Sequence, residues 1–381
     1  MSDYDVAIVG AGPAGAAAAL VLGRAGARVA VLERESLPRY KTCGGGLVRR
    51  GAAWAGVDVT PVVERACRRV TLYLHDLGCG FTVERAEPLI AMTMRERLDF
   101  LLVTAAAAGG AALLAPCEVQ SLTANAGAVR LGTTRGSVQA DFVIAADGAL
   151  GPTARLAGWP DERYLAPALE YEIPVNDRTL ARFAAEPRFD AGAVPFGYGW
   201  VFPKASHLSV GVMSMHRGAR ELHELLARYV TFLGIDGGRT RRRHGSVIPV
   251  RSRSGPFIRG RVLVAGDAAG FVDPVTAEGI SLALRSGQLA AQALARGSGV
   301  ADAAAAYQAA LSREILPDLR AGRLVAHLMH QHPALRRSLF ARFGQSLVDG
   351  VADVFAGAHG YGTIPRRTVA RWTRRVRRAG L

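Results

Sequence analysis

A glycine-rich turn near the start of the chain has the spacing of a dinucleotide-binding loop. Gly10, Gly12 and Gly15 follow the pattern GxGxxG, between a short apolar run and a stretch rich in alanine and leucine. The first glycine permits a tight turn, the second lets the backbone approach a pyrophosphate, and the third lets a helix pack on the preceding strand. The N–H groups at the start of that helix would then face the phosphates.

An acidic residue stands where such a loop requires one. Glu33 ends the next apolar run, 23 positions after Gly10, and a carboxylate there can accept hydrogen bonds from both hydroxyls of a ribose. This partner suits a free 2′-hydroxyl rather than a 2′-phosphate, so the sequence indicates NAD or FAD. Arg34 is the next residue, and we include it among the candidate cofactor-binding residues.

Two acidic residues end later apolar runs, where doubly wound sheets bind their ligands. Asp147 is followed by Gly148, and Asp267 follows Gly266. Asp267 could accept a hydrogen bond from a ribityl hydroxyl, and a helix starting near Gly279 would direct its N–H groups at the electron-rich N1–C2 carbonyl edge of a flavin. These motifs favour FAD over NAD. The alternative is that Asp267 only caps a helix.

The elements that must position these residues follow from the apolar periodicity. One βαβ unit is expected from a strand over 4–9, a helix over 16–24 and a strand over 28–32, and the Gly-rich segment 38–51 is expected to be a loop. Further helices are expected over 95–109, 221–232, 279–294, 302–315 and 319–330. Further strands are expected over 112–124, 128–133, 137–143, 199–202, 207–213 and 261–265.

Residues 170–250 change to short alternating strands around one helix, which indicates a second, mostly antiparallel sheet. We therefore predict an α/β fold: a Rossmann-like FAD-binding domain with an inserted antiparallel β-sheet substrate domain and a helical C-terminus. The FAD-binding domain is predicted to be discontinuous, over 1–165 and 255–300. The substrate domain is predicted over 166–254, and the C-terminal helical region with its basic tail over 301–381.

Composition narrows the class of protein. Of 381 residues 50% are hydrophobic and 21% charged, so the chain is not disordered. The four cysteines form no CxxC pair and lie near no histidine cluster, so we expect neither a disulfide framework nor a metal site. The N-terminus resembles no secretory signal and no apolar run is long enough to span a bilayer, so we expect a cytoplasmic protein.

The net charge of +15 is concentrated at the C-terminus. Residues 366–381 contain seven arginines and no acid, and Val369, Trp372 and Val376 would share one stripe of a helix. This pattern suits a peripheral helix on an anionic membrane, at its inner face, although a solvated or disordered tail would look the same. The arginine excess can also reflect a GC-rich genome. Nucleic acid is not expected, because no aromatic-interleaved basic platform is present.

Three further segments carry a resemblance to a known family. Residues 38–46 read PRYKTCGGG and residues 198–204 read YGWVFPK, and Gly266-Asp267 leads through Pro274 to Gly279-Ile280. With the glycine loop, these motifs over about residues 4–295 resemble the geranylgeranyl reductase family, within the para-hydroxybenzoate hydroxylase-like superfamily of FAD enzymes. Lys41 and Lys204, the two lysines of the chain, fall inside these signatures.

The resemblance implies FAD contacts at specific positions. It places Ala14 and Gly15 at the pyrophosphate, Glu33 at the adenosine ribose and Arg95 at the phosphates. The remaining implied contacts are Val119 at the adenine, Cys43, Gly44 and Gly46 beside the isoalloxazine, and Asp267, Gly279 and Ile280 at the ribityl chain and ring. For Arg95 a solvated helix arginine is the alternative, and for Cys43 a small loop residue.

The resemblance also implies reduction of isoprenoid C=C bonds, in which one carbon receives a hydride and the other a proton. Candidate proton donors are Cys43, Tyr198 or a water molecule. Tyr198 and Trp200 should point to one face of a strand, and Trp200 and Phe202 either line a channel for a prenyl chain or are ordinary core residues. Lys204 is expected at the mouth of that channel or in solvent. No second GxGxxG unit is present, so NADPH or a reduced carrier would dock only transiently.

Two other functions compete with this one. An FAD-dependent monooxygenase or halogenase acting on an aromatic or polyketide-like substrate would share the fold, and YGWVFP is loosely similar to a halogenase WxWxIP motif. Tyr198 and Phe202 depart from that motif, since they replace its first Trp and its Ile. A non-enzymatic basic protein that binds membranes or nucleic acid is the third hypothesis.

Overall fold

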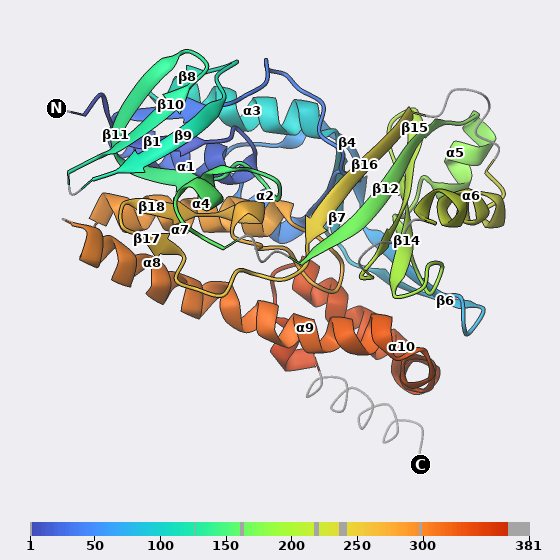
Figure 1. Cartoon of the computed structure of the whole chain (residues 1–381). Helices are drawn as coiled ribbons and strands as arrows, with labels where there is room; N and C mark the ends of the chain where they lie inside the picture. The colour runs from blue at the N-terminus through green and yellow to red at the C-terminus, as the bar shows by residue number, and fades with distance from the viewer. Residues whose placement is uncertain are drawn as a thin grey trace.

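The computed structural model describes residues 2–125, 127–160, 164–216, 221–235, 242–296 and 299–364. Within these residues two large sheets stand at opposite ends of the molecule, and a layer of helices runs below them (Figure 1). No helix among these segments is both long and apolar enough to cross a bilayer. The basic tail, residues 366–381, lies outside the described residues, so the peripheral-helix prediction stays a prediction.

The first sheet has the order β17-β18-β11-β1-β2-β8, and its central strands are parallel. The hairpin of β9 and β10 extends β11 away from the centre. The strands are β1 (Tyr4–Val9), β2 (Val29–Leu32), β8 (Ala112–Leu114), β9 (Val119–Ala124), β10 (Val129–Thr133), β11 (Gly136–Ala145), β17 (Ile258–Arg259) and β18 (Val262–Val264). The predicted βαβ unit and the strands around it are thus present with small shifts in their bounds, except that the strand predicted over 112–124 is divided into β8 and β9, which pair with different strands.

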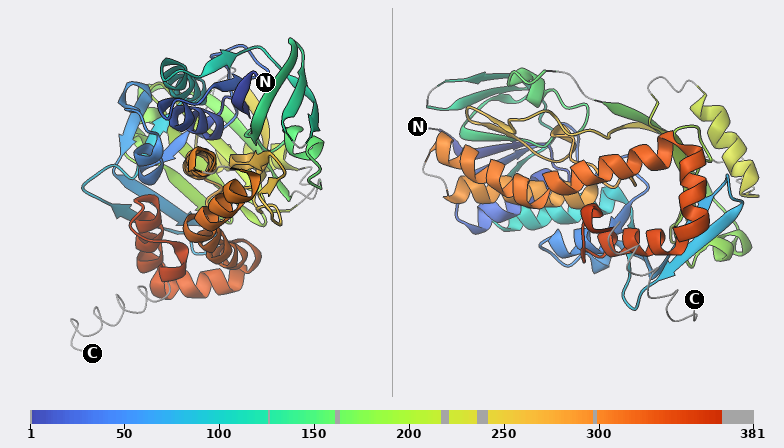
Figure 2. Two further views of the ribbon diagram at one scale, coloured as in Figure 1. Left: turned by 90° about the vertical axis from the view of Figure 1, so that its left-hand side faces the viewer. Right: turned by 90° about the horizontal axis from the view of Figure 1, so that it is seen from below.

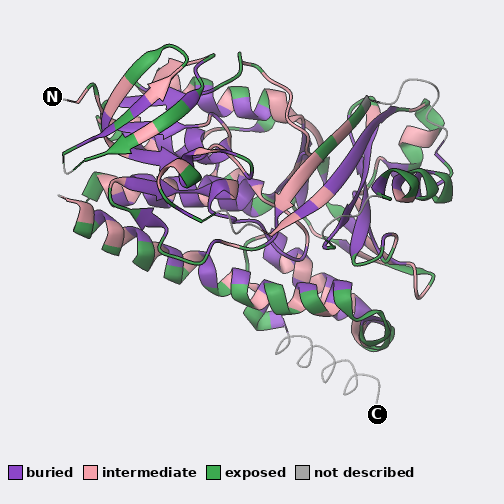
Figure 3. Cartoon of the chain, viewed as in Figure 1, coloured by how far each residue is buried: buried purple, intermediate pink, exposed green. Residues whose placement is uncertain are grey.

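Helix α1 (Pro13–Arg24) packs between α3 (Arg95–Ala108) and α7 (Ile280–Arg296). Its run of alanines lets both neighbours come close, and Figure 3 shows α1 and α7 buried over most of their surfaces. The closest approach is at Gly287, where a Cβ atom would lie 2.1 Å from the carbonyl oxygen of Ala14. The start of α1 therefore depends on a helix more than 250 residues away in the sequence.

The second sheet has the order β16-β12-β15-β14-β13-β5-β6 and is antiparallel except where β13 meets β5. Its strands are β5 (Arg69–Leu74), β6 (Cys79–Glu84), β12 (Leu165–Pro174), β13 (Arg188–Ala191), β14 (Gly197–Pro203), β15 (His207–Ser214) and β16 (Arg242–Pro249). Two of them, β5 and β6, precede residue 166, so the sheet draws strands from both sides of the predicted domain boundary. The boundaries themselves stay a prediction.

Alternation along β14 gives the second sheet two different faces. Val201 packs on the side of α5 (Asp177–Phe183) and α6 (Leu222–Phe232). Tyr198, Trp200 and Phe202 point to the opposite side, as the spacing predicts for Tyr198 and Trp200, and share a core with α10 (Pro333–Phe355). The aromatic side chains therefore face the interior of the molecule between the two large sheets.

The prediction of a loop over 38–51 is wrong at its C-terminal end. Gly46–Val48 forms β3, which pairs with β7 (Ile90–Thr93), and β7 also pairs with β4 (Val63–Cys67) to make a three-stranded sheet. A short helix, α2 (Arg49–Trp54), follows β3 directly. Strand β3 depends on pairing with residues more than 40 positions away, which local periodicity does not report.

The C-terminal layer consists of α8 (Val300–Glu314), α9 (Leu316–Gln331), α10 and the short turn η3 (Tyr361–Thr363). Seen from below, α8 and α9 run end to end along the length of the molecule before α10 turns back (Figure 2). The long helix α10 was not predicted. Its buried side contains Arg336, Gly344 and Gly350, which interrupt the apolar stripe that sequence reasoning relies on.

Candidate functional site

One cavity of about 280 Å³ extends from the glycine loop of the first sheet to the aromatic face of the second. It brings together almost all predicted cofactor-binding residues, which come from distant parts of the chain. Those lining it are Gly10, Gly12, Ala14, Glu33, Arg34, Cys43, Gly44, Gly46, Arg95, Val119, Asp267, Gly279 and Ile280. Tyr198 and Trp200, predicted as catalytic, line its other end. Their roles remain predictions.

The glycine loop has the backbone geometry that its spacing predicts. Gly10 has a φ of +102°, and a Cβ there would lie 2.5 Å from the carbonyl oxygen of Ala146, so only glycine fits. Gly15 lies behind the cavity, where a Cβ would lie 1.9 Å from the carbonyl oxygen of Gly10. Glycine at position 15 thus allows α1 to pack against the loop. The contact of Gly15 with a pyrophosphate, which the resemblance implies, stays a prediction.

Gly12 leaves space at the mouth of the loop for an anionic group. A Cβ at Gly12 would point toward two guanidinium groups, those of Arg39 and Arg95, each 3.9 Å away. The N-terminus of α1 begins at the next residue, Pro13. Two arginines, a helix N-terminus and an uncrowded glycine are the elements that bind a pyrophosphate.

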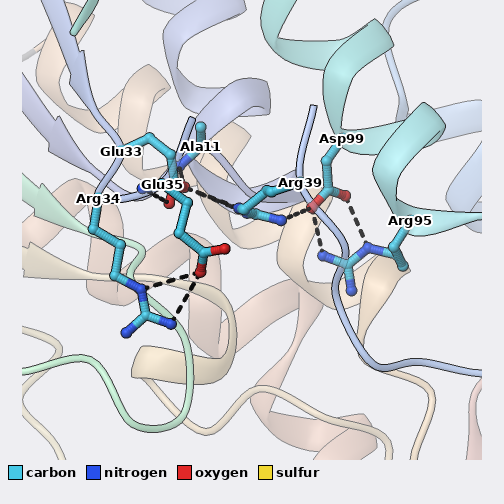
Figure 4. A network of polar contacts seen from close by, with 7 residues as sticks. All are labelled: Ala11, Glu33, Arg34, Glu35, Arg39, Arg95 and Asp99. Carbon is cyan, nitrogen blue, oxygen red and sulfur yellow. Dashed lines mark hydrogen bonds and ion pairs between the residues drawn. The ribbon is translucent and has the colours of Figure 1, made fainter. Parts of the chain in front are cut away.

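Glu33 belongs to a chain of charges that fixes both arginines (Figure 4). One Glu33 oxygen, Oε2, accepts a hydrogen bond from the backbone N–H of Ala11 (2.9 Å) and lies 3.3 Å from Nε of Arg39. Arg39 also contacts Asp99 (3.0 Å), and Asp99 is bound by Nε of Arg95 (2.8 Å). The network joins the end of β2, the 34–45 segment and the start of α3.

This network changes the interpretation of Arg95. Its side chain is only 10% exposed, so it is not a solvated helix arginine. Burial alone would lower the pKa of Arg95, but the Asp99 carboxylate outweighs burial and raises the pKa above its ordinary value. Sequence reasoning missed Arg39 and Asp99, although Asp99 follows Arg95 at the i,i+4 spacing of a helical ion pair and Arg39 lies inside the PRYKTCGGG signature.

The buried Lys204 supports the Cys43–Gly46 loop through a hydrogen bond. Nζ of Lys204 donates hydrogen bonds to the carbonyl oxygens of Gly44 (2.6 Å) and Thr93 (2.8 Å), and the residue is 1% exposed. Both expected positions of Lys204, at a channel mouth or in solvent, are therefore wrong. The two family signatures meet at this ammonium group, because the loop and β14 pack together.

The same loop lies directly against the aromatic end of the cavity. A Cβ at Gly44 would be 2.8 Å from the ring of Phe202 and 3.1 Å from Nε1 of Trp200. The Sγ atom of Cys43 accepts a hydrogen bond from the N–H of Gly45 (3.4 Å), and the Arg95 guanidinium is also beside it. Glycine at position 44 thus allows the loop and the aromatic side chains to form one continuous wall.

The polar atoms of Trp200 and Tyr198 are hydrogen-bonded to other groups of the protein. Nε1 of Trp200 donates to Oγ of Ser209 (3.2 Å), and the Tyr198 hydroxyl donates to the carbonyl oxygen of Thr276. Burial, and secondarily Asp273, raises the pKa of Tyr198. The remaining lining at this end is mostly apolar and includes Phe189, Ile248 and Phe355. This end can therefore hold an apolar chain.

Asp267 and Asp147 occupy different local environments at the first sheet. Asp267 lies within the turn η2 (Gly266–Ala268), whose N-cap residue is Ala265, and α7 begins only at Ile280, so the capping alternative for Asp267 is not found. Burial raises the pKa of Asp267. Asp147 accepts a hydrogen bond from the backbone N–H of Thr153 (2.9 Å) at the start of α4 (Thr153–Leu156).

One buried acid in the cavity was not predicted from the sequence. Glu170 lies on β12, lines the cavity and is 2% exposed. Its Oε1 accepts a hydrogen bond from the Ser209 hydroxyl (2.5 Å). Burial raises the pKa of Glu170 to about 7, against the opposing effects of Ser209 and Lys204. An acidic residue in an alternating strand is usually solvent-facing, so periodicity gave no sign of its position.

Comparison with known proteins agrees with a flavin site. Residues 3–311 match the family described as FAD binding domain, which is most of the chain. The chloroplastic geranylgeranyl diphosphate reductase of Nicotiana tabacum is 31% identical over 77% of this chain, and the match spans 66% of that enzyme, slightly under two thirds.

Two microbial relatives are matched over more of their length. A menaquinone reductase of Mycolicibacterium smegmatis is 29% identical, over 85% of this chain and 84% of that protein. Digeranylgeranylglycerophospholipid reductase 2 of Methanothermobacter thermautotrophicus is 30% identical, over 77% of this chain and 79% of that protein.

The fold is also found in solved structures. A geranylgeranyl bacteriochlorophyll reductase-like protein of Thermoplasma acidophilum superimposes with a TM-score of 0.80 at 21% identity, over 95% of this chain and 98% of that one. The α/β fold, with mixed sheets around a Rossmann-type FAD-binding region, is thereby established. The chain belongs to the geranylgeranyl reductase family of FAD-dependent oxidoreductases.

Proposed function

We propose that this flavoenzyme reduces C=C bonds of an isoprenoid chain. One observation carries the proposal: the Cys43–Gly46 loop and the aromatic face of β14 form one continuous wall of the cavity, and Lys204 joins them. A cofactor that reaches this loop from the glycine turn would meet an apolar chain against Trp200 and Phe202. The apolar walls keep water from that contact.

At the cofactor end, the residues present suit FAD from one end to the other. Glu33 would bind the adenosine ribose, the Gly10–Ala14 turn with Arg39 and Arg95 would bind the pyrophosphate, and Asp267 would bind the ribityl chain. When bound in its reduced form, FAD supplies a hydride. The residues of the protein orient the cofactor, exclude water and provide a proton.

The substrate class follows from the cavity and from the relatives together. The names of two relatives contain a geranylgeranyl group attached to different head groups, a diphosphate and a glycerophospholipid. The geranylgeranyl chain, and not the head group, is thus common to the two names, and an apolar chain of this kind suits the apolar end of the cavity. A third relative is named for a quinone, so we include a prenylated quinone among the test substrates.

The proposal also covers the role of the second sheet, the electron donor and the membrane. We assign the second sheet the role of an inserted substrate domain, since its aromatic face lines the cavity. NADPH or a reduced electron carrier would supply electrons by transient docking. The basic segment 366–381 would hold the enzyme at the inner face of an anionic membrane, where a prenyl lipid resides.

Anaerobic mixing tests the function directly. Enzyme with chemically reduced FAD is mixed without oxygen with geranylgeranyl diphosphate, menaquinone or a digeranylgeranyl glycerophospholipid in detergent. We expect one of these to restore the absorbance of oxidised flavin and to gain two hydrogen atoms per turnover by mass spectrometry. If none does, and an aromatic substrate is instead modified only when oxygen is present, the monooxygenase or halogenase alternative replaces this proposal.

A further inference from the structure

We infer that Glu170 is the acid that delivers the proton to the double bond, an inference that rests on the proposed reductase function. Glu170 projects from β12 into the cavity beside the Cys43–Gly46 loop. Neither the glycine loop nor the two family signatures contains this residue. Its position joins the cofactor end of the cavity to the aromatic end.

The hydrogen bonds of Glu170 leave one oxygen available. Oε1 accepts from the Ser209 hydroxyl, which in turn accepts from Nε1 of Trp200. Oε2 is buried and has no hydrogen-bond partner within the described residues. A buried carboxyl oxygen without a partner is costly unless it carries a proton or meets a ligand, and here it lies on the wall of a cavity.

The surroundings favour a protonated Glu170 in the resting site. Burial raises its pKa to about 7, and Glu172 on the same strand raises it further, while Ser209, Lys204 and the Cys43 backbone lower it. Lys204 directs two of its protons at the carbonyl oxygens of Gly44 and Thr93. The titratable and charged groups facing Glu170 are Lys204 from the end of β14, Glu172 from β12, His244 from β16, and Tyr40 and Cys43 from the loop.

Two competing donors are committed to other contacts. The Tyr198 proton is donated to the carbonyl of Thr276, and burial raises the pKa of this hydroxyl. The Cys43 sulfur faces two hydrogen-bond donors: it accepts a hydrogen bond from the N–H of Gly45 and lies beside the Arg95 guanidinium. Glu170 combines access to the cavity with a proton that is not held by a backbone carbonyl.

The proposed step balances in atoms and electrons. As the π bond breaks, one carbon receives a hydride from reduced flavin, which is oxidised, and the other carbon forms a C–H bond with the proton of Glu170. The O–H bond of the carboxyl breaks and leaves a carboxylate. His244 lies directly opposite Glu170 on β16, the edge strand of the second sheet, and is half-buried.

Replacing Glu170 with Gln tests the inference, with Glu172→Gln as the matched control on the same face of β12. In the wild type, flavin reoxidation by geranylgeranyl diphosphate or another active prenyl substrate should slow tenfold per pH unit above about pH 7, because the acid form is required. Glu170→Gln should reoxidise about 10²- to 10⁴-fold more slowly, without this pH dependence. Glu170→Asp should restore part of the rate and its pH dependence. Glu172→Gln should keep a pH-dependent rate, with the fall moved to lower pH because the Glu172 charge raises the pKa of Glu170.

A readout without turnover accompanies the rates. In infrared spectra of the FAD-bound wild type, the band of a protonated carboxyl group should disappear as the pH rises through about 7. The Glu172→Gln variant should also show this titrating band, and the Glu170→Gln variant should lack it. A Glu170→Gln enzyme with the wild-type rate and pH profile, or no such band, overturns the inference. A wild type that no prenyl substrate reoxidises defeats the proposed function instead, and the infrared titration still reports whether Glu170 holds a proton.

Discussion

A buried ammonium group links the two segments, 38–46 and 198–204, that carry the resemblance to the geranylgeranyl reductase family. Lys204 is at the end of β14, yet its hydrogen bonds end at Gly44 and Thr93, on the wall that faces the cofactor end of the cavity. Burial lowers the pKa of Lys204, and Glu170 opposes this effect. The lysine is therefore a support for the flavin loop, and its charge also influences the acid beside it.

At this residue scale we expect Lys204→Met to loosen the flavin loop. Two buried carbonyl oxygens would lose their donor, at a cost of about 1–3 kcal/mol each in the free energy of unfolding, and FAD should bind more weakly. Urea unfolding and fluorescence titration with FAD measure the two effects. The matched variant Lys41→Met, at a half-buried position, should unfold closer to the wild type, and equal losses in both variants would contradict the role assigned to Lys204.

At the scale of elements, the parts that obey local rules were predictable from the sequence. The β1–α1–β2 unit, its glycine turn and Glu33 follow from spacing alone, because one turn and one helix fix their geometry. The pairing of β3 with β7 and the helix α10 were missed, since they depend on partners far along the chain. Arg39 and Glu170 were missed for the same reason, because each acquires its environment from a distant segment. Asp99 was missed although its i,i+4 spacing to Arg95 is local.

The contact of α1 with α7 gives a prediction at this scale. Alanine is favoured over glycine in a helix by about 1 kcal/mol, but Gly287→Ala would place a methyl group 2.1 Å from the Ala14 carbonyl. Overpacking costs about 1–3 kcal/mol, so we expect a lower melting temperature and weaker FAD binding, because Ala14 belongs to the cofactor loop. Gly245→Ala, where a Cβ would meet nothing within 4 Å, should change neither. A Gly287→Ala protein as stable as the wild type would show that the helices can separate freely.

At the scale of the whole molecule, the C-terminal helices complete the cavity of a fold built from two sheets. Arg50 on α2 lies within 3.7 Å of Asp273, Glu278 and Asp318, and Tyr361 of η3 donates to Asp273 (2.7 Å). This buried cluster connects α2, the segment before α7, α9 and η3. Because Glu278 also lines the cavity, the helical layer supports the segment that carries Gly279 and Ile280.

The buried acids of the cavity should make the stability of the molecule depend on pH in a definite direction. The folded-state pKa of Glu170 is raised from 4.5 to about 7, so between these values the folded protein binds more protons than the unfolded chain, and stability falls as pH rises. For this residue the loss amounts to on the order of 3 kcal/mol between pH 4.5 and 7. Glu170→Gln removes this titration. With both proteins FAD-bound, the free energy of unfolding of the variant should therefore rise relative to that of the wild type as the pH increases from 4.5 to 7. Urea unfolding of both proteins at several pH values between 4.5 and 7.5 measures the difference, and a difference that stays constant with pH would mean that Glu170 is ionised in the folded protein throughout.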